Sequence, residues 1–238
     1  MNQPHLYSAE QVIALENVVF RWPNTDQPTL DIAALAVAAG QHLFIKGPSG
    51  CGKSTLLSLL TGINTASQGR VSLLGQDLAR LKASQRDRFR ADHIGYIFQQ
   101  FNLLPYLSVL DNVILPCQFS ALRKSKVSGA LQARACELLE RLHLPHALLH
   151  KSVLELSIGQ QQRVAAARAL IGEPHLIIAD EPTSALDHDN RSAFIDLLLE
   201  EVNRAGSTLV FVSHDPTLES CFERSIHLPV INRARGMQ

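Results

Sequence analysis

Apolar residues gather in short runs toward both ends of the chain, and polar or glycine-containing turns separate these runs. Their length predicts β-strands rather than long helices. We expect strands over residues 12–20, 30–37, 43–45, 71–75, 94–98, 176–179 and 208–212. The first run alternates enough to indicate an edge strand. The later runs are almost wholly apolar, which is typical of parallel strands buried on both faces.

The middle of the chain carries helical spacing instead. Helices are expected over residues 80–90, 109–115, 127–142, 157–171 and 191–203. A basic segment, 122–126, links two of them, and no strand is expected near it. The pattern predicts one α/β domain, in which residues 1–100 and 165–238 form the core and residues from about 101 to 164 form a helical insertion.

Charge and cysteine usage narrow the possible partners. The chain has 238 residues, with 22 Lys or Arg and 22 Asp or Glu, so its formal net charge is zero. Nothing in this balance indicates affinity for nucleic acid or an anionic membrane, and we predict no nucleic-acid partner. The 4 cysteines lack zinc-ligand spacing and indicate reduced thiols in a cytosolic protein. No apolar run approaches the ~20 residues of a membrane helix, so another chain would supply any span.

A glycine-rich segment joins the run 43–45 to a helix that begins near Leu56. It reads Gly47-Pro48-Ser49-Gly50-Cys51-Gly52-Lys53-Ser54-Thr55 and fits the phosphate-loop pattern. The glycines let the loop curl with its N–H groups pointing inward, and the helix N-terminus favours an anion. Lys53 is expected near the terminal phosphates of a nucleotide, with the Ser54 hydroxyl as a ligand for Mg²⁺.

Polar side chains end several of the expected strands. Asp180 follows an apolar run, as a magnesium-organising carboxylate should, and Glu181 can accept a proton from an attacking water. Gln99 and His214 also end strands, where ligands sit in open α/β sheets. Gln99 can ligate Mg²⁺ or orient water, and His214 can donate to a phosphate.

A second anion site is predicted where the helix 157–171 begins. Ser157-Ile158-Gly159-Gln160 has the Ser-x-x-Gln form of a capping box, and Gly159 lets a phosphate come close. One nucleotide does not need two such sites from one chain. A two-fold dimer uses both, with each Ser157 end closing over the other subunit's phosphate loop. The alternative is an ordinary helix cap.

These motifs together resemble those of the ATP-binding-cassette (ABC) ATPases over almost the whole chain. The loop at Gly47 to Thr55 is similar to Walker A, and the run 176–181 resembles Walker B with its catalytic glutamate. Residues 156–160, followed by Gln161-Gln162-Arg163, resemble the family signature, although Ile158 replaces its first glycine.

Single residues extend the resemblance. Gln99 resembles the Q-loop, His214 the switch histidine, and the run 184–187 the D-loop, with Asp187 as a nucleotide-binding residue. Trp22 stands where the family has an aromatic residue, usually tyrosine, that stacks on adenine. Stacking tolerates any flat ring, so tryptophan can serve there as well. The C-terminus is short, so no appended regulatory domain is expected.

The resemblance implies a P-loop NTPase (RecA-like) core with an antiparallel β edge subdomain and the inserted helical subdomain. It implies binding of ATP with Mg²⁺, hydrolysis by a homodimer, and a transmembrane permease supplied by a separate chain. The subunit would then be cytoplasmic and peripheral on the inner face of the cytoplasmic membrane. The run 94–105 resembles the lipoprotein-releasing and macrolide-export group. Alternatives are a mechanotransmission ATPase that moves no cargo, a soluble ABC ATPase acting on DNA or ribosomes, and a phosphotransferase.

Two segments are expected to lie on the surface of the protein. The stretch Phe98 to Leu104 carries apolar side chains that should be partly exposed, and in the family this junction contacts the permease. Phe101 is therefore expected to lie on that contact surface. The basic residues from Arg123 to Lys126 have no aromatic residues between them for base stacking, and we predict a solvated face.

Overall fold

The computed structural model describes residues 11–184 and 188–235. Its strands are β1 Gln11–Phe20, β2 Leu30–Ala38, β3 Leu43–Lys46, β4 Gln68–Leu73, β5 Gln76–Asp77, β6 Ile94–Ile97, β7 Leu176–Asp180, β8 Thr208–Ser213 and β9 Arg224–His227. Its helices are α1 Lys53–Leu60, α2 Ala83–His93, α3 Val109–Ile114, α4 Pro116–Phe119, α5 Ala121–Lys126, α6 Leu131–Arg141, α7 Ile158–Leu170, α8 His188–Arg204 and α9 Leu228–Ile231. The expected strands are confirmed to within a few residues at their ends.

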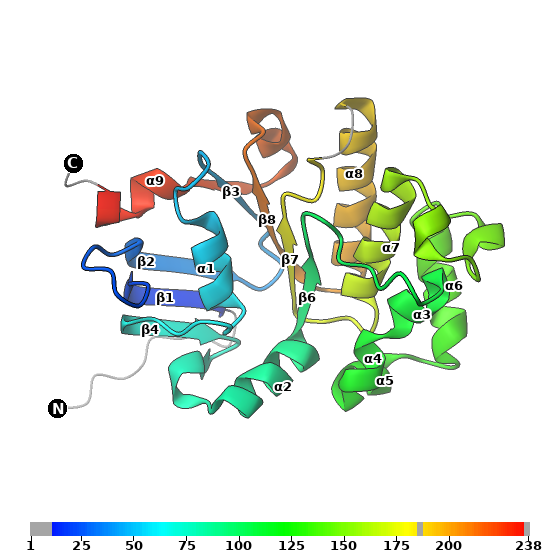
Figure 1. Cartoon of the computed structure of the whole chain (residues 1–238), viewed down its shortest axis with the longest axis horizontal. Helices are drawn as coiled ribbons and strands as arrows, with labels where there is room; N and C mark the ends of the chain where they lie inside the picture. The colour runs from blue at the N-terminus through cyan, green and yellow to red at the C-terminus, as the bar shows by residue number, and fades with distance from the viewer. Residues whose placement is uncertain (1–10, 185–187, 236–238) are drawn as a thin grey trace.

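A parallel sheet occupies the middle of the molecule, with strand order β6-β7-β8-β3-β9 (Figure 1). The strand β3 pairs with β8 on one side and β9 on the other, although both come late in the chain. Because all five strands are parallel, their carboxyl ends meet at one edge. The segments that follow β3, β6, β7 and β8 therefore lie along the same edge.

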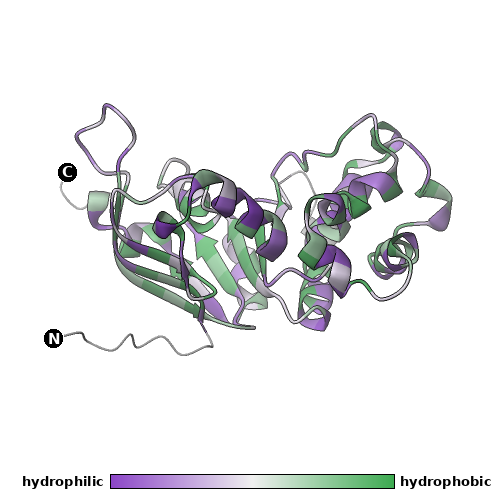
Figure 2. Cartoon of the chain, turned by 90° about the horizontal axis from the view of Figure 1, so that it is seen from below, coloured by the Kyte–Doolittle hydropathy of each residue, from purple (hydrophilic) through white to green (hydrophobic). Residues whose placement is uncertain are grey.

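Each face of this sheet has its own core. Phe44 stacks on Phe211 at a centroid distance of 6.0 Å, on the face that α7 and α8 cover. Ile45 and Val210, which alternate with them, point to the opposite face and pack with α1 and the antiparallel strands. Figure 2 shows hydrophobic residues gathered on the strands between these layers. The continuous apolar runs follow from burial on both faces.

The second sheet is antiparallel, with order β2-β1-β4-β5. The expectation that residues 12–20 form an edge strand is wrong, because β1 pairs with β2 on one side and β4 on the other. Its side chains Val12, Ile13 and Leu15 are all buried, as an inner strand requires. The antiparallel sheet and α1 lie to one side of the parallel sheet (Figure 1).

The helices α3 to α7 pack together on the other side of the parallel sheet (Figure 1). The segment 122–126 is not a link but most of helix α5, and the Arg123 side chain is buried, with 2% exposed. Its guanidinium donates to the carbonyl oxygens of Ala169 and Ile171 at the end of α7. The prediction of a fully solvated basic face is therefore wrong at Arg123. Helix α6 begins only at Leu131, since Gly129 adopts a φ of 77°.

Asn232, near the end of the described chain, ties that end to the antiparallel sheet. Its Oδ1 accepts from the Asp31 N–H at 2.8 Å, and its Nδ2 donates to the Thr29 oxygen at 3.0 Å. The side chain is buried, so these bonds satisfy polar groups that water does not reach. In the described ranges, no helix is both long and apolar enough to cross a membrane.

Candidate active site

The phosphate loop connects β3 to α1 and curls around the side chain of Lys53. The Nζ of Lys53 donates to the carbonyl oxygens of Gly47, at 2.8 Å, and Pro48, at 3.1 Å. Gly52 caps α1 with a φ of 104°, and a Cβ there would lie 2.9 Å from the Leu30 side chain. Only glycine fits that turn without strain. The loop thus holds an ammonium beside the free N–H groups of a helix N-terminus.

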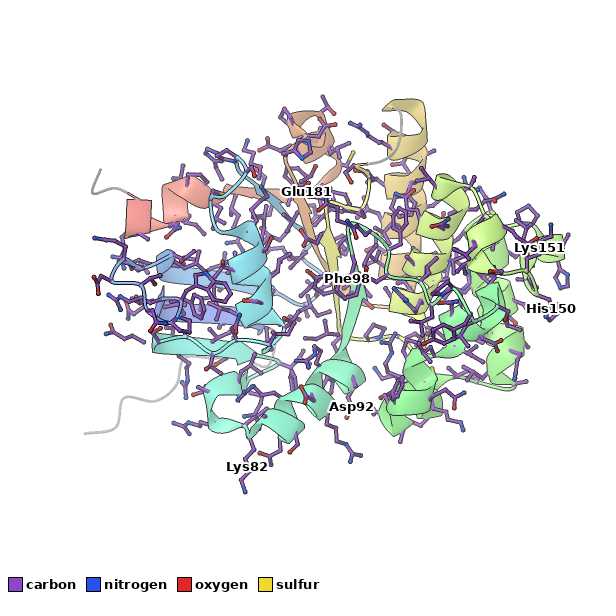
Figure 3. The ribbon with its side chains drawn as sticks, viewed as in Figure 1. Lys82, Asp92, Phe98, His150, Lys151 and Glu181 are labelled. Atoms are coloured by element: carbon purple, nitrogen blue, oxygen red, sulfur yellow. The ribbon has the colours of Figure 1, made fainter. Side chains whose placement is uncertain are left out.

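A cavity of about 350 Å³ opens between this loop and the ends of β6 and β7. Its lining brings together expected site residues from three separate parts of the chain. They are Ser49, Gly50, Gly52, Lys53, Ser54, Thr55, Gln99, Asp180 and Glu181, joined by Thr29. Figure 3 shows Glu181 and Phe98 in the middle of the molecule, whereas His150 and Lys151 lie far out on the helical insertion.

Glu181 stands at the centre of the charged groups. Its carboxylate lies 3.7 Å from the Lys53 Nζ through one oxygen and 3.3 Å from the His214 Nδ1 through the other. The backbone leaves β7 with a φ of 45° at Glu181, and its N–H donates to the Val212 oxygen at 2.9 Å. That bond to β8 fixes the turn, so the carboxylate is aimed across the cavity.

Asp180, the last residue of β7, is partly buried. Burial raises the pKa of Asp180, while a hydrogen bond from the Tyr96 hydroxyl at 3.3 Å and the charge of Lys53 lower it. Burial also raises the pKa of Tyr96, so this phenol remains a donor. A cation beside a partly desolvated carboxylate favours its charged form.

The segment after β6 departs from one expectation. Gln99 is exposed and lines the cavity, and Phe98 is 38% exposed. Phe101, however, is buried at 6% exposed and packs in the core with Ile97 and the helices of the insertion. The expectation that Phe101 lies on an exposed contact surface is therefore wrong, because the chain turns inward at that residue with a φ of 58°.

The expected second anion site does not line this cavity. Ser157 caps α7, its Oγ accepts from the Gln160 N–H at 3.3 Å, and the Gln160 side chain accepts from the Ser157 N–H at 3.0 Å. The capping box is therefore confirmed, and Gly159 follows in the first turn. Trp22 is 43% exposed and packs edge-on against Phe20, and it is not among the residues that line the cavity.

The remaining expected site residues include one whose side chain a nucleotide cannot contact and one outside the described ranges. The Cys51 side chain is buried, at 1% exposed, so position 51 offers a nucleotide only its backbone. Asp187 lies outside the described residues. Sequence reasoning missed Arg168 and named Gln162 only beside the signature, and both are buried polar residues of α7. The sequence does indicate that Arg168 is buried, because it is the one charged residue in the otherwise apolar helical run Ala165-Ala166-Ala167-Arg168-Ala169-Leu170.

Comparison with known proteins gives consistent results. A family model described as ABC transporter matches residues 30–184. The uncharacterized ABC transporter ATP-binding protein YbbA of Escherichia coli (strain K12) is 42% identical over 194 residues, covering 82% of this chain and 83% of YbbA. The lipoprotein-releasing system ATP-binding protein LolD of Bacteroides fragilis (strain YCH46) is 38% identical over 194 residues, covering 82% of this chain and 88% of LolD.

Solved structures extend this similarity to three dimensions. A dimeric post-hydrolysis state of the ATP-binding cassette MJ0796, bound to ADP and Pi, matches with a TM-score of 0.78 and 35% identity. The match covers 90% of this chain and 93% of that one. The similarity therefore extends over most of both chains.

Proposed function

The chain belongs to the ABC transporter family, and from that premise we propose how its residues carry out ATP hydrolysis. It is an ATP-binding and ATP-hydrolysing subunit that works as a homodimer and drives a transmembrane permease supplied by a separate chain. One observation carries the residue assignment. A single cavity holds the ammonium of Lys53 and the carboxylates of Asp180 and Glu181 at the edge where the parallel strands end.

Glu181 is the proposed general base. It takes a proton from a water that attacks the terminal phosphorus of ATP, the bond from that phosphorus to the ADP oxygen breaks, and ADP and phosphate result. His214, with its Nδ1 3.3 Å from the Glu181 carboxylate, holds the water and donates to the phosphate. Lys53, whose Nζ is held inside the loop by the Gly47 and Pro48 carbonyl oxygens, binds the phosphates together with the N–H groups of the loop.

We propose that Ser54, Gln99 and Asp180 hold Mg²⁺. All three line the same cavity, and their hydroxyl, amide and carboxylate oxygens are the hard donors that this ion prefers. The donor set therefore fits the ion. When bound, Mg²⁺ neutralises negative charge on the terminal phosphates.

The nucleotide site is completed by the second subunit. The N-terminal end of α7, with Ser157, Gly159 and Gln160, does not line its own cavity, and we propose that it closes over the phosphate loop of the other copy. Trp22 is exposed enough to stack on adenine. Asp187 is proposed to contact the nucleotide from the segment after Glu181.

The permease is proposed to dock where α2, β6 and α4 meet. A groove of about 310 Å³ there is lined by the exposed rings of Phe98 and Phe119, which are 38% and 74% exposed, and by Arg90. Phe98 directly precedes Gln99, so this contact would reach the cavity through one residue. We propose that the subunit sits on the inner face of the cytoplasmic membrane through this permease, in an export or lipoprotein-releasing system.

Replacement of the general base tests this function. In Glu181→Gln the amide keeps the shape but cannot take a proton, and turnover should fall by about 10²–10⁴-fold while ATP-bound dimer accumulates. Lys53→Ala is the matched control, since it should lose ATP binding and form no such dimer. Turnover is measured by phosphate release, and dimer by gel filtration with ATP. Normal turnover in Glu181→Gln would contradict the assignment.

A further inference from the structure

Two buried polar side chains of α7 hold backbone carbonyls beside the cavity. Gln162, with 1% exposed, donates through its Nε2 to the Pro182 oxygen at 2.9 Å. Arg168, with 9% exposed, donates through Nη1 to the Asn102 oxygen at 2.7 Å and through Nη2 to the Phe101 oxygen at 2.5 Å. One helix thus contacts both segments that follow the cavity-lining ends of β6 and β7.

The backbones held in this way are unfavourable on their own. Phe101 and Asn102 are consecutive residues with φ of 58° and 48°, and Glu181, which precedes Pro182, has a φ of 45°. Residues other than glycine seldom adopt this left-handed region, and they stay there only when their surroundings hold them. The two donors of Arg168 reach the carbonyls of both strained residues in the segment behind Gln99.

Arg168 is an unusual residue for this position if packing were its only task. Burial lowers its pKa, and none of the described carboxylates lies within ion-pair distance to offset the cost. The other residues from Val164 to Leu170 are apolar, and a methionine or leucine at position 168 would continue that run without the free-energy cost of burying a charge. Since Ser157, at the start of the same helix, is proposed to meet the ATP held by the other subunit, the contacts of Arg168 link that event to Gln99.

We propose that Arg168 is a positioning residue for ATP hydrolysis, and that Gln162 assists it. Arg168 holds the Phe101–Asn102 turn so that Gln99 stays in the cavity, while Gln162 holds the turn that begins at Glu181. This proposal rests on the proposed function, because it assigns to Arg168 the placement of residues that act on ATP. The rival explanation is that both contacts only stabilise the fold.

The test compares arginines that make the same kind of contact in different places. Arg86, on α2, also donates to two backbone carbonyls, those of Gly62 at 3.1 Å and Leu81 at 2.8 Å, and lines no part of the cavity. Full-length Arg168→Met, Arg168→Lys and Arg86→Met are purified, and kcat, KM and the affinity for Mg-ATP are measured for each. The methionines keep an unbranched apolar side chain at each position and remove every donor.

The positioning role predicts a split between kcat and KM. Misplacement of a reacting group by about 1 Å costs on the order of 10²-fold, and we expect that loss in the kcat of Arg168→Met with KM and Mg-ATP affinity nearly unchanged. Arg168→Lys should recover part of kcat, because its amine can reach one carbonyl. Arg86→Met should keep the wild-type kcat even if its melting temperature falls.

Two results would overturn the proposal. One is a wild-type kcat in folded Arg168→Met, and the other is a parallel loss of kcat and affinity in both methionine variants. If Arg168→Met does not fold, Arg168→Lys decides, since a lowered kcat at unchanged KM supports positioning and a wild-type kcat excludes it. Glu181→Gln separates this from the proposed function. If that variant is inactive while Arg168→Met is fully active, only the positioning role fails, whereas normal turnover in Glu181→Gln refutes the function itself.

Discussion

Gly95, in β6, sits where α7 crosses the strand, and one added methyl group there would force the two elements apart. An alanine Cβ at this position would lie 2.2 Å from the Ala169 carbonyl oxygen and 2.7 Å from the Ile177 Cδ1. Non-bonded carbon contacts are favourable at about 3.5–4.0 Å, so α7 must retreat from β6 by about 1 Å. A helix carbonyl cannot rotate away as a flexible side chain could.

The cost of Gly95→Ala follows from that displacement. Overpacking typically destabilises a protein by about 1–3 kcal/mol, and a clash with backbone should reach the upper end. At about 2–4 °C per kcal/mol for a domain of this size, the melting temperature should fall by about 6–12 °C. The same retreat draws Arg168 away from Phe101 and Asn102, so turnover should fall by about 10²-fold at temperatures where the variant is still folded.

Thermal unfolding checks the first effect. Phosphate release measured at about 20 °C, roughly 25 °C or more below the melting temperatures of mesophile domains, checks the second. Gly129→Ala is the control, because Gly129 has a φ of 77° and no atom within 4 Å of an added Cβ. It should lose only about 1–2 kcal/mol for the left-handed backbone and keep its turnover. Normal stability in Gly95→Ala would refute the steric argument. Lost stability with normal turnover would refute the link between α7 spacing and hydrolysis.

Two further predictions concern neighbouring phenylalanines and a histidine pair. Phe101→Ala should lower the free energy of unfolding in urea by about 3–5 kcal/mol, because the ring is buried. Phe98→Ala should leave that free energy unchanged and weaken the stimulation of ATPase activity by the permease. A larger loss of stability in Phe98→Ala than in Phe101→Ala would contradict the burial of the two rings. His93 and His175 lie 3.1 Å apart through their Nδ1 atoms, and burial lowers the pKa of both below the ordinary 6.5, with Lys126 adding to the effect and Asp92 opposing it at His93. A lowered pKa means that the folded state favours the neutral rings, so this stabilisation is complete above pH 6.5 and is lost as pH falls through the lowered values. The free energy of unfolding should therefore fall between about pH 7.5 and about pH 5.5, and it should fall less in His175→Asn than in the wild type. Equal losses of unfolding free energy in the two proteins would show that the histidine pair does not cause the fall.

The strands and the phosphate loop could be predicted from sequence because their causes are local. An apolar run, a glycine turn and a capping box can each be recognised from a few consecutive residues, as the capping box of Ser157 and Gln160 shows. The assembly of Lys53 with Glu181 followed from the rule that parallel strands end at one edge. The boundaries assigned to the helical insertion and the role of each site residue remain predictions.

The failures have non-local causes. Arg123 resembled a solvated charge because no local pattern shows that the last carbonyls of α7 need a donor. Phe101 resembled a surface contact because its inward turn depends on Arg168, which lies far along the chain. The position of β1 as an inner strand likewise depends on which strands return to pair with it.

The position of β3 also has a consequence for the order in which a nascent chain matures. Its pairing partners β8 and β9, and Asn232 with its bonds to Thr29 and Asp31, are all translated long after the loop at Gly47. Pairing between strands so distant in sequence must wait for the chain to close a long loop. On the ribosome, β3 would therefore remain an unpaired apolar segment while the antiparallel sheet and the insertion are being made. We expect nascent chains that stop before β8 to bind no ATP and to be held by chaperones through Leu43, Phe44 and Ile45.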